Sequence, residues 1–482
     1  MGETTIGVDV GTTVTKAVAF DGNGRPIFEV ARPTEVVRLP GNRYEQDTEQ
    51  VVKSVHEVLA ELASKVPRGD VSAIGITAQG DGLWLVDEGG YSVRPAISWL
   101  DGRAHDIVDG WEKSGLLEQI FRITGSLVFP GASGPILAWL ARNEPENLAD
   151  AHTAAYCKDV VLQRLTGTRA TDLSDASVPW KFLRRSEYCT ELLEAAGLGE
   201  YSHLLAPVLP EPSGALTRDA ALLTGFRAET PVVGAPYDLV ASALGADVDE
   251  VGDGLLIVGT TLACQVLTND VDVAGEPGGL SLSTATPGRW MRAMPAMVGA
   301  AALDWAMKLT GQRVETLEKH LADTVPGASG VRVLPFLAES GERAPFKDRL
   351  ACGQIDGIRL GTTDSEILRA FCEAIAFSAR HCFEAAGLTG SVFATGGGIS
   401  SPAWRQIFAD VLGRPIATAG EAQIGARGAA IAARRAAGLS DLPPIDVFVT
   451  EPNPDVSARY EDLYQRYLGR VASARENWKS HL

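Results

Sequence analysis

The chain has 482 residues, of which 45% are hydrophobic and 22% are charged, and its formal net charge is −18. This length exceeds what one ordinary core organises, so we expect roughly two large domains with well-buried interiors. The acidic balance, with no basic run in the sequence, argues against nucleic acid and anionic membranes as partners, because both reward clustered Lys and Arg.

The cysteines and the first residues bear on the cellular compartment. Six cysteines are scattered without a C-x-x-C pair, and the seven histidines show no metal-ligand spacing, so reduced thiols fit better than a disulfide framework or a zinc site. The chain enters an apolar strand at Ile6 to Val8 without a preceding signal core, and no apolar stretch reaches roughly 18 residues. These features predict a cytoplasmic protein.

The first predicted element is a hairpin at residues 4–21, in which a Gly-Thr-Thr turn separates two strands. Glycine lets an anion approach the backbone closely, and threonine adds a hydroxyl donor, so such a turn suits phosphate. For one copy alone, a plain hairpin turn is the alternative. Asp9 precedes the turn by two residues, and a carboxylate beside phosphate is costly unless a cation intervenes. Asp9 therefore predicts Mg²⁺, held through water, and an Asp that bonds to its own turn is the alternative.

Alternating helices and strands are predicted for the rest of the first half. Val51 to Leu62 has the apolar spacing of an amphipathic helix, and Ala73 to Thr77 and Pro231 to Gly234 read as strands. A helix is predicted from Asp238 to Gly245. This pattern is typical of an α/β fold.

A second hairpin, predicted at residues 253–270, repeats the first. Its Gly-Thr-Thr turn stands 248 residues after the first turn, close to half the chain, and Ile257 takes the place of Asp9. For two such turns that face each other across a cleft, phosphate binding is the better interpretation. We expect a domain boundary near Leu244 to Asp253, with domains at residues 1–246 and 247–482.

The second half continues with helices, a strand and a closing helix. The predicted helices are Glu366 to Ala386, Trp404 to Leu412, Ala426 to Ala437 and Val456 to Ala472. A strand is predicted at Ser391 to Thr395, and a Pro-rich connection from Leu439 to Asp455. Three glycines at 396–398 leave no side chain to obstruct a flat base and ribose, and a flexible connector is the alternative.

Ten motifs in order resemble those of the FGGY carbohydrate kinases over nearly the whole chain. They are GVDVGTTVTKAV (7–18), YEQD (44–47), GITAQGDGLWLVD (75–87), PAISWLDGRA (95–104), TDLSDAS (171–177), VVGAPYDLVASALGA (232–246), VGTT (258–261), PFLAESGERAPFKD (335–348), ATGGGISSPAWRQIFADVLGRPI (394–416) and GARGAAIAA (425–433). The resemblance implies an α/β, duplicated actin/hexokinase-like (ribonuclease H-like) ATPase fold with two domains around a catalytic cleft. It also implies ATP and Mg²⁺ as cofactors.

The resemblance implies roles for residues that match the family's nucleotide motifs. The first phosphate motif places Thr12, Thr13 and Lys16 near the ATP phosphates, and the second does so for Gly259 and Thr260. The adenosine motif covers Gly396, Gly397 and Gly398, with Ser401 at its start.

Asp238 matches the family's catalytic aspartate, which orients the acceptor hydroxyl and accepts its proton late in a loose phosphoryl-transfer transition state. Judged from its position alone, Asp238 is also a candidate helix N-cap.

The predicted sugar site begins at Gln79-Gly80-Asp81-Gly82, where many pentulose kinases of the family carry Gln-Met-His-Gly and glycerol kinases carry Gln-Arg-Glu-Thr. Asp81 can accept two hydrogen bonds from vicinal hydroxyls, and Gln79 can both donate and accept. Asp81 departs from the His pattern, which speaks against ordinary D-xylulose specificity. The segment looks like the erythritol-kinase and L-xylulose-kinase-like branches, so we expect erythritol or a similar four-carbon polyol first.

Other residues are assigned to the substrate cleft by the same resemblance. Trp99 is expected to pack on the carbon chain of the substrate, with core packing as the alternative. Asp101 is expected in the cleft, although a salt bridge with Arg103 explains it equally well. Tyr237 is expected to face the sugar, and Gly131, where glycerol kinases carry a Tyr, suggests a larger pocket. Glu342 and Arg343 are interpreted as structural, holding a loop near the cleft.

We therefore expect an ATP-dependent kinase of a small sugar or polyol, with a homodimer as the expected assembly. A non-enzymatic sensor or chaperone-like ATPase of the same fold is the alternative. A dinucleotide-dependent enzyme is disfavoured, because no G-x-G-x-x-G with a following ribose acid occurs.

Overall fold

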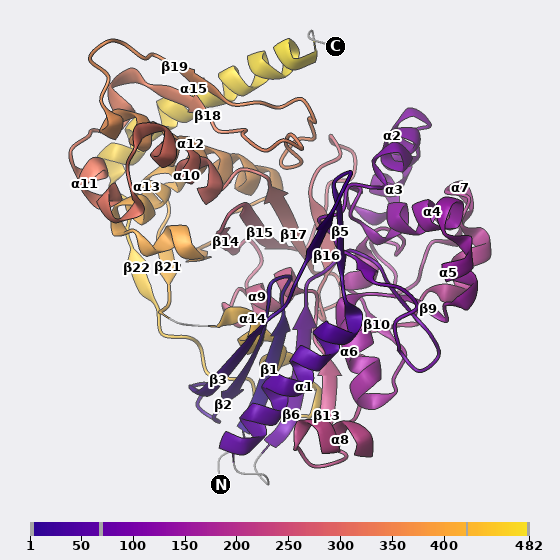
Figure 1. Ribbon diagram of the computed structural model, residues 1–482. Helices are drawn as coiled ribbons and strands as arrows, with labels where there is room; N and C mark the ends of the chain where they lie inside the picture. Colours follow the sequence, from indigo (N-terminus) through magenta and orange to yellow (C-terminus); the bar gives the residue numbers. More distant parts are fainter. Residues whose placement is uncertain (1–3, 67–70, 421–422, 480–482) are drawn as a thin grey trace.

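The structure, a computed structural model, describes residues 4–66, 71–420 and 423–479. Two mixed sheets form its centre (Figure 1). The N-terminal sheet contains, in spatial order, β12 (Ser213–Ala215), β13 (Pro231–Gly234), β6 (Val71–Ala78), β1 (Thr4–Val10), β2 (Val14–Phe20) and β3 (Pro26–Pro33). The C-terminal sheet contains β16 (Leu280–Ser283), β17 (Trp290–Ala296), β15 (Leu262–Thr268), β14 (Gly254–Val258), β20 (Val392–Thr395), β21 (Ile416–Thr418) and β22 (Phe448–Thr450).

The duplication predicted from the two hairpins extends to the sheets. Strand β1 pairs antiparallel with β2 and parallel with β6, and β14 pairs antiparallel with β15 and parallel with β20. Each Gly-Thr-Thr turn therefore lies at the same place in its sheet, where the first strand of the half ends. The chain passes from one sheet to the other between α9 (Asp238–Gly245) and β14, where the predicted boundary lies.

The predicted helices are confirmed, and most of them exceed their predicted length by no more than one turn. They are α1 (Thr48–Lys65), α9, α12 (Asp364–Ala386), α13 (Pro402–Leu412), α14 (Ile424–Ala436) and α15 (Pro454–Lys479). The connection predicted from Leu439 to Asp455 is wrong in one part, because it contains the edge strand β22. This strand has only three residues, and Phe448 is 73% exposed, so it carries no buried apolar alternation that a sequence pattern could register.

Helix α14 crosses from the second half of the sequence onto the N-terminal sheet (Figure 1). Glycine permits this approach: a Cβ at Gly7 would lie within 3.0 Å of the backbone oxygen of Ala426, and one at Gly75 within 3.0 Å of that of Ala429. A Cβ at Gly428 would likewise overlap the backbone oxygen of Ala241, on α9. The two helices and the sheet therefore pack backbone against backbone.

Helix α9 has the reciprocal position. Its residues Val240 and Ala243 share one hydrophobic cluster with Leu255, Leu267 and Ala293 of the C-terminal sheet. Each half thus covers a sheet of the other half with a helix, and α9 and α14 form a central layer between the sheets (Figure 1).

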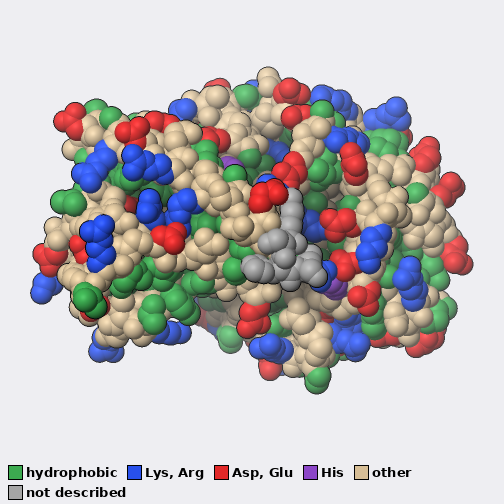
Figure 2. Space-filling view, turned by 90° about the horizontal axis from the view of Figure 1, so that it is seen from above, with side chains coloured by type: hydrophobic (Ala, Val, Ile, Leu, Met, Phe, Trp, Pro, Cys, Tyr) green, Lys and Arg blue, Asp and Glu red, His purple; other side chains and the backbone are tan. Residues whose placement is uncertain are grey.

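The β16–β17 hairpin ties the two halves together along one side. The backbone N–H of Leu127 donates to the oxygen of Gly279 at 2.8 Å, and that of Ser281 donates to Ser126 Oγ at 2.9 Å. Trp290 Nε1 donates to the oxygen of Leu183 at 3.0 Å. Of the helices that the structure describes, none has the length and apolar character that a bilayer crossing requires. Figure 2 shows basic and acidic side chains interspersed over the face seen from above.

Candidate active site

The first Gly-Thr-Thr turn joins β1 to β2 and is closed by a hydrogen bond from the backbone N–H of Gly11 to the oxygen of Val14, at 2.9 Å. Thr12 is half-buried and Thr13 is exposed. Across the hairpin, Asp9 pairs with Lys16, so both side chains lie on the same face of the sheet. The turn thus offers a hydroxyl to solvent with one carboxylate and one amine beside it.

Asp9 is half-buried at the end of β1, and burial raises the pKa of its carboxyl group to about 6, although the charge of Lys16 opposes the shift. A Cβ at Gly425 would overlap Asp9 Oδ2, so this oxygen lies against the first turn of α14. Among the described residues, no group of the turn at 11–13 donates to the Asp9 side chain. The turn-bonding alternative is therefore not what the structure shows.

Lys16 lies on β2 and connects to the start of α14. Its Nζ donates to Gln423 Oε1 at 3.2 Å, and Gln423 Nε2 donates to both carboxylate oxygens of Glu29 at 3.0 Å. Gln423 is the N-cap of α14 and has a φ of 40°. The amine predicted to meet phosphate is thus held at the junction of the N-terminal hairpin and α14.

Asp238 is the first residue of α9, directly after the segment that leaves β13. The N-cap is Tyr237, and no side chain makes a cap hydrogen bond, so the N-cap alternative for Asp238 is wrong. The pKa of the half-buried Asp238 carboxyl is raised to about 8, first by burial, then by the charge of Asp9, with a smaller effect of Asp81. The structure therefore brings the three carboxylates predicted for the site into one electrostatic environment.

Asp81 is 3% exposed and has a φ of 55°. Its Oδ2 accepts a hydrogen bond from the Tyr237 hydroxyl at 2.6 Å, whereas its Oδ1 is buried and has no partner among the described residues. Burial raises the pKa of Asp81 to about 6, and Tyr237 and Arg343 act against the shift. A Cβ at Gly80 would overlap the Tyr237 ring, so glycine at this position lets the tyrosine reach Asp81.

A chain of hydrogen bonds links the predicted sugar pocket to the phosphate turn. Trp99 Nε1 donates to Thr12 Oγ1 at 2.9 Å, and this hydroxyl donates to Gln79 Oε1 at 3.0 Å. Gln79 Nε2 in turn donates to Gln46 Oε1 at 2.9 Å. Trp99 is half-buried as a residue, so core packing does not explain it fully. Gln79 and Trp99 are thus fixed in orientation by Thr12.

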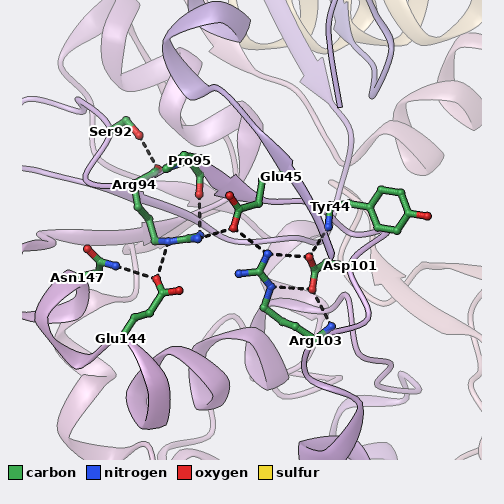
Figure 3. A network of polar contacts seen from close by, with 9 residues as sticks. All are labelled: Tyr44, Glu45, Ser92, Arg94, Pro95, Asp101, Arg103, Glu144 and Asn147. Atoms are coloured by element: carbon green, nitrogen blue, oxygen red, sulfur yellow. Dashed lines mark hydrogen bonds and ion pairs between the residues drawn. The ribbon is translucent and has the colours of Figure 1, made fainter. Parts of the chain in front are cut away.

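Asp101 belongs to a structural network (Figure 3). Its side chain is 0% exposed and accepts hydrogen bonds from the backbone N–H groups of Tyr44 (2.6 Å) and Arg103 (2.8 Å). The Arg103 guanidinium also donates to both Asp101 oxygens at 2.9 Å and to Glu45 at 2.8 Å. The predicted substrate contact of Asp101 is therefore corrected in favour of the salt-bridge alternative, because both oxygens are buried and saturated by protein donors.

Gly131 also has a structural reason that differs from the prediction. A Cβ at this position would overlap the backbone oxygen of Trp99. The backbone oxygen of Gly131 accepts from the N–H of Gly82 at 2.9 Å. Glycine at 131 thus reflects close backbone packing beneath Trp99, so its presence does not by itself indicate a larger pocket.

The second turn and the glycine triplet lie side by side at the end of β14. The backbone oxygens of Gly259 and Thr260 accept from Ala300 (2.9 Å) and Ala301 (3.2 Å), at the start of α10 (Ala300–Thr310). The Thr260 residue is exposed. Cβ atoms at Gly396 and Gly398 would overlap Val258, whereas Gly397 is exposed with nothing near its Cβ position. The triplet packs tightly on β14 at two of its three residues, so it is not a loose connector.

Ser401 forms the N-cap of α13. Its Oγ accepts from the backbone N–H of Trp404 at 3.2 Å and donates to Glu318. Glu318 lies on α11 (Leu317–Ala322) and also accepts from the N–H of Ala403 at 3.2 Å. The predicted adenosine contact of Ser401 stays a prediction, and Glu318 is a neighbour that no sequence motif indicated.

A buried network supports the loop before Asp238. Ser174 Oγ accepts from the backbone N–H of Tyr237 at 2.8 Å and donates to Asp172. Lys158, 1% exposed, lies 3.1 Å from Asp172 and 2.9 Å from Asp175. The motif at 171–177 was recognised in the sequence, but its lysine partner was not, because the two are joined only by the fold.

Glu342 and Arg343 follow the prediction in part. Glu342 Oε1 accepts from the backbone N–H groups of Met297 (2.7 Å) and Arg343 (2.9 Å), which holds the loop as expected. The Arg343 guanidinium lies 5.8 Å from the centre of the Trp99 ring and 5.1 Å from that of Phe129. Arg343 thus extends from the second half of the chain to the predicted sugar pocket, which sequence reasoning missed.

The described residues contain no group of three or more His, Cys, Asp or Glu side chains that could hold a metal ion. The negative charge of Asp9 raises the pKa of Asp238. A divalent cation near Asp9 would offset this repulsion between the two carboxylates. These residues fit Mg²⁺ carried mainly by phosphate and water rather than by a cage of protein ligands.

Comparison with known proteins identifies the family of the chain. The family model of the N-terminal domain of the FGGY family of carbohydrate kinases matches residues 4–245, and that of its C-terminal domain matches residues 254–437. Erythritol kinase of Brucella abortus is 30% identical over 498 aligned positions, which cover 97% of this chain and 95% of that protein. Xylulose kinase of Escherichia coli is 31% identical, with 91% and 92% covered.

Solved structures show the same architecture. Xylulose kinase of Rhodospirillum rubrum superposes with a TM-score of 0.89 at 28% identity, and the match covers 99% of this chain and 100% of that one. The predicted α/β, duplicated actin/hexokinase-like fold is confirmed by this likeness and by the repeated sheet topology. The chain therefore belongs to the FGGY family of carbohydrate kinases.

Proposed function

We propose that the protein transfers the terminal phosphoryl group of ATP to a hydroxyl group of a polyol or pentulose, with Asp238 as the base. A bond forms between the acceptor oxygen and the terminal phosphorus, the bond from that phosphorus to the bridging oxygen of ADP breaks, and the acceptor proton goes to Asp238. The observation that carries this proposal is the position of Asp238, which opens α9 without capping it and lies in the electrostatic environment of Asp9 and Asp81. Burial first, and then Asp9, raise its pKa to about 8, so bound Mg²⁺ would have to lower this pKa for Asp238 to accept a proton at neutral pH.

The nucleotide is proposed to span both halves of the chain. Thr12, Thr13 and Lys16 would bind phosphate from the N-terminal sheet, and Gly259 and Thr260 from the C-terminal sheet. Gly397, Gly398 and Ser401 would line the adenosine site. The exposure of Thr13 and Thr260 supports this assignment, as does the contact of the glycine triplet with Val258, one residue before the second turn.

Mg²⁺ is the proposed companion of ATP, held at Asp9 through water. When bound, it supplies positive charge that offsets the phosphates during transfer. Asp9 would stay ionised at neutral pH because its pKa of about 6 lies below it, and bound cation would lower that pKa further.

The acceptor is proposed to be a short polyol, with erythritol first and the pentuloses next. The similarity to erythritol kinase and to xylulose kinases supports this range. The unpartnered Asp81 Oδ1 supports it physically, because a buried carboxylate oxygen without a donor is costly until a hydroxyl group binds.

A substrate panel tests the proposed activity. ADP release would be measured across erythritol, threitol, glycerol, D- and L-xylulose, ribulose and ribitol, each against the rate without acceptor. We expect at least one of them to stimulate ADP release many-fold. An ATP-binding sensor or chaperone-like ATPase would show no acceptor-dependent release, and that result would overturn the proposal.

Three coarser assignments accompany this function. Domains at residues 1–246 and 247–482, a cytoplasmic location and a homodimer or monomer without nucleic acid or membrane partners are proposed from the sequence. Limited proteolysis near residue 250 tests the boundary, and light scattering of the purified protein tests the assembly.

A further inference from the structure

Two polar groups at one end of the sugar pocket have hydrogen-bonding capacity that the protein leaves unused. Asp81 Oδ1 is buried without a donor, and the partner oxygen Oδ2 is already occupied by Tyr237. Arg343 uses its Nε to donate to the backbone oxygen of Pro295 at 2.8 Å, and no described group accepts from its terminal nitrogens. The site therefore presents one free acceptor and a pair of free donors.

The two groups interact electrostatically. Arg343 lies over the rings of Trp99 and Phe129, and burial lowers its pKa, with the charge of Asp81 as the largest effect that opposes this shift. Trp99 is bound through Thr12 to Gln79, which belongs to the same segment as Asp81. Arg343 comes from the second half of the chain, and Glu342 fixes its backbone. The pocket is thus completed by a residue of the other half.

We propose that Arg343 is a specificity-determining residue that, together with Asp81, binds a vicinal diol of the acceptor. One hydroxyl donates to Asp81 Oδ1, and the oxygen on the adjacent carbon accepts from the Arg343 guanidinium. This inference rests on the proposed kinase activity and specifies its substrate class. The contact with Asp81 satisfies an oxygen that is otherwise buried without a donor, and the contact with Arg343 gives its guanidinium an acceptor, so the pair selects acceptors that carry both oxygens.

The same pair selects against carboxylated acceptors. A carboxylate would be attracted by Arg343, but it would stand beside Asp81, with Asp238 close enough to raise its cost further. Like charges brought together in a largely buried site disfavour binding. The acceptor is therefore a neutral diol, as in linear polyols and ketoses with adjacent hydroxyl groups.

Steady-state kinetics with the best acceptor of the panel test the proposal. Arg343→Gln is expected to raise the acceptor KM about 10- to 100-fold, the loss of a hydrogen bond to a charged group, with the KM for ATP little changed. Arg343→Lys is expected to recover part of the loss, because it keeps the charge but not the planar fork. The matched control is Arg349→Gln: Arg349 lies in the same loop and pairs with Asp109 of the first half, but outside the pocket.

Monodeoxy analogues of that acceptor distinguish a direct contact from a structural one. In the wild-type protein, removal of the oxygen that meets Arg343 should raise KM about 10-fold or more, whereas in Arg343→Gln the same removal should cost little. If Arg343 only stabilised the loop, the analogue penalties would be equal in both proteins, and the proposal would be wrong.

The pH profile gives a second readout. Asp81 is faced by Tyr237, Arg343, Asp238 and Tyr156, and of these only Arg343 is a cation. Because Arg343 lowers the pKa of Asp81, loss of its charge is expected to move the part of the kcat/KM profile that Asp81 controls to higher pH in Arg343→Gln and not in Arg343→Lys.

The outcomes separate this proposal from the proposed function. An active wild-type enzyme with unchanged acceptor KM in Arg343→Gln overturns the role of Arg343 alone. No acceptor-dependent turnover in the wild type overturns the kinase function itself. If Arg343→Gln does not fold, the monodeoxy analogues are compared between the wild type and Arg343→Lys instead. Equal KM penalties in these two proteins would then contradict the proposal.

Discussion

The carboxyl group of Asp238, the proposed base, also affects the stability of the folded protein. Its pKa of about 8 lies above the value near 3.8 of the unfolded chain, so between these pH values the folded protein holds a proton that the unfolded chain releases. The contribution of this carboxyl to stability is therefore full below pH 3.8 and is lost as pH rises through 8.

We therefore predict that, at pH 8 to 9, the free energy of unfolding of Asp238→Asn exceeds that of the wild type by roughly 1 kcal/mol. This value is well below the full pKa shift because solvent screens the half-buried carboxyl group. Thermal unfolding at pH 9 and at pH 5 measures the difference, which should shrink at the lower pH. A variant less stable than wild type at pH 9 would show that the carboxylate is satisfied in the folded protein.

Trp99 connects the acceptor pocket to the phosphate turn through one hydrogen bond. Trp99→Phe keeps an aromatic face but removes the donor to Thr12, so we expect kcat/KM for the acceptor to fall about 5-fold, the worth of one neutral hydrogen bond. Trp99→Ala should cost far more, because it also removes the face. Equal losses of kcat/KM in the two variants would show that Trp99 acts only through its indole N–H and not through its aromatic face.

At the scale of elements, the close packing of α14 on the N-terminal sheet depends on glycine. Gly75→Ala is predicted to destabilise the protein by about 2–3 kcal/mol, because its Cβ would overlap the backbone oxygen of Ala429, which cannot move without shifting α14. Gly110→Ala in α2 (His105–Lys113) is the control: its Cβ would meet nothing within 4 Å, and alanine favours helix.

Chemical denaturation of the two variants measures both effects. A Gly75→Ala protein as stable as Gly110→Ala would show that α14 is not held against β6 as the structure has it.

Local elements were predictable from the sequence, and contacts between distant residues were not. The two hairpins, the start of α9 at Asp238 and the long helix α12 follow from spacing within about 25 residues. Asp101 was misassigned because one of its donors, the backbone N–H of Tyr44, lies 57 residues away in the chain, and a carboxylate in a sequence motif does not show where its hydrogen bonds go.

The contacts of Gly131 and Arg343 were not predictable for the same reason. A Cβ atom at Gly131 would overlap the backbone of Trp99, and Arg343 contacts the rings of Trp99 and Phe129 from the opposite half of the chain. Strand β22 was missed because three exposed edge residues leave no pattern. The resemblance to the family identified candidate positions, but only the fold assigned each one its neighbours.

At the scale of the whole molecule, the two halves are joined by the α9 and α14 layer and, along one side, by the β16–β17 hairpin. Exposed pairs such as Arg349–Asp109 and Lys347–Glu112 contribute little, about 0.2–1 kcal/mol each. Nucleotide and acceptor together are therefore expected to draw the halves closer, which excludes water from the transfer. Small-angle scattering should show a smaller radius of gyration with an ATP analogue and acceptor than with either alone, and an unchanged radius would contradict closure.

The most direct test of the account is acceptor-dependent ADP release by the wild type and by Asp238→Asn, with nucleotide binding followed by calorimetry in both. The account predicts that Asp238→Asn binds ATP like the wild type but loses at least about 100-fold in kcat, since the acceptor hydroxyl has no base. Turnover by Asp238→Asn within a few-fold of the wild type would contradict the assignment of Asp238, and with it the chemistry proposed for this cleft.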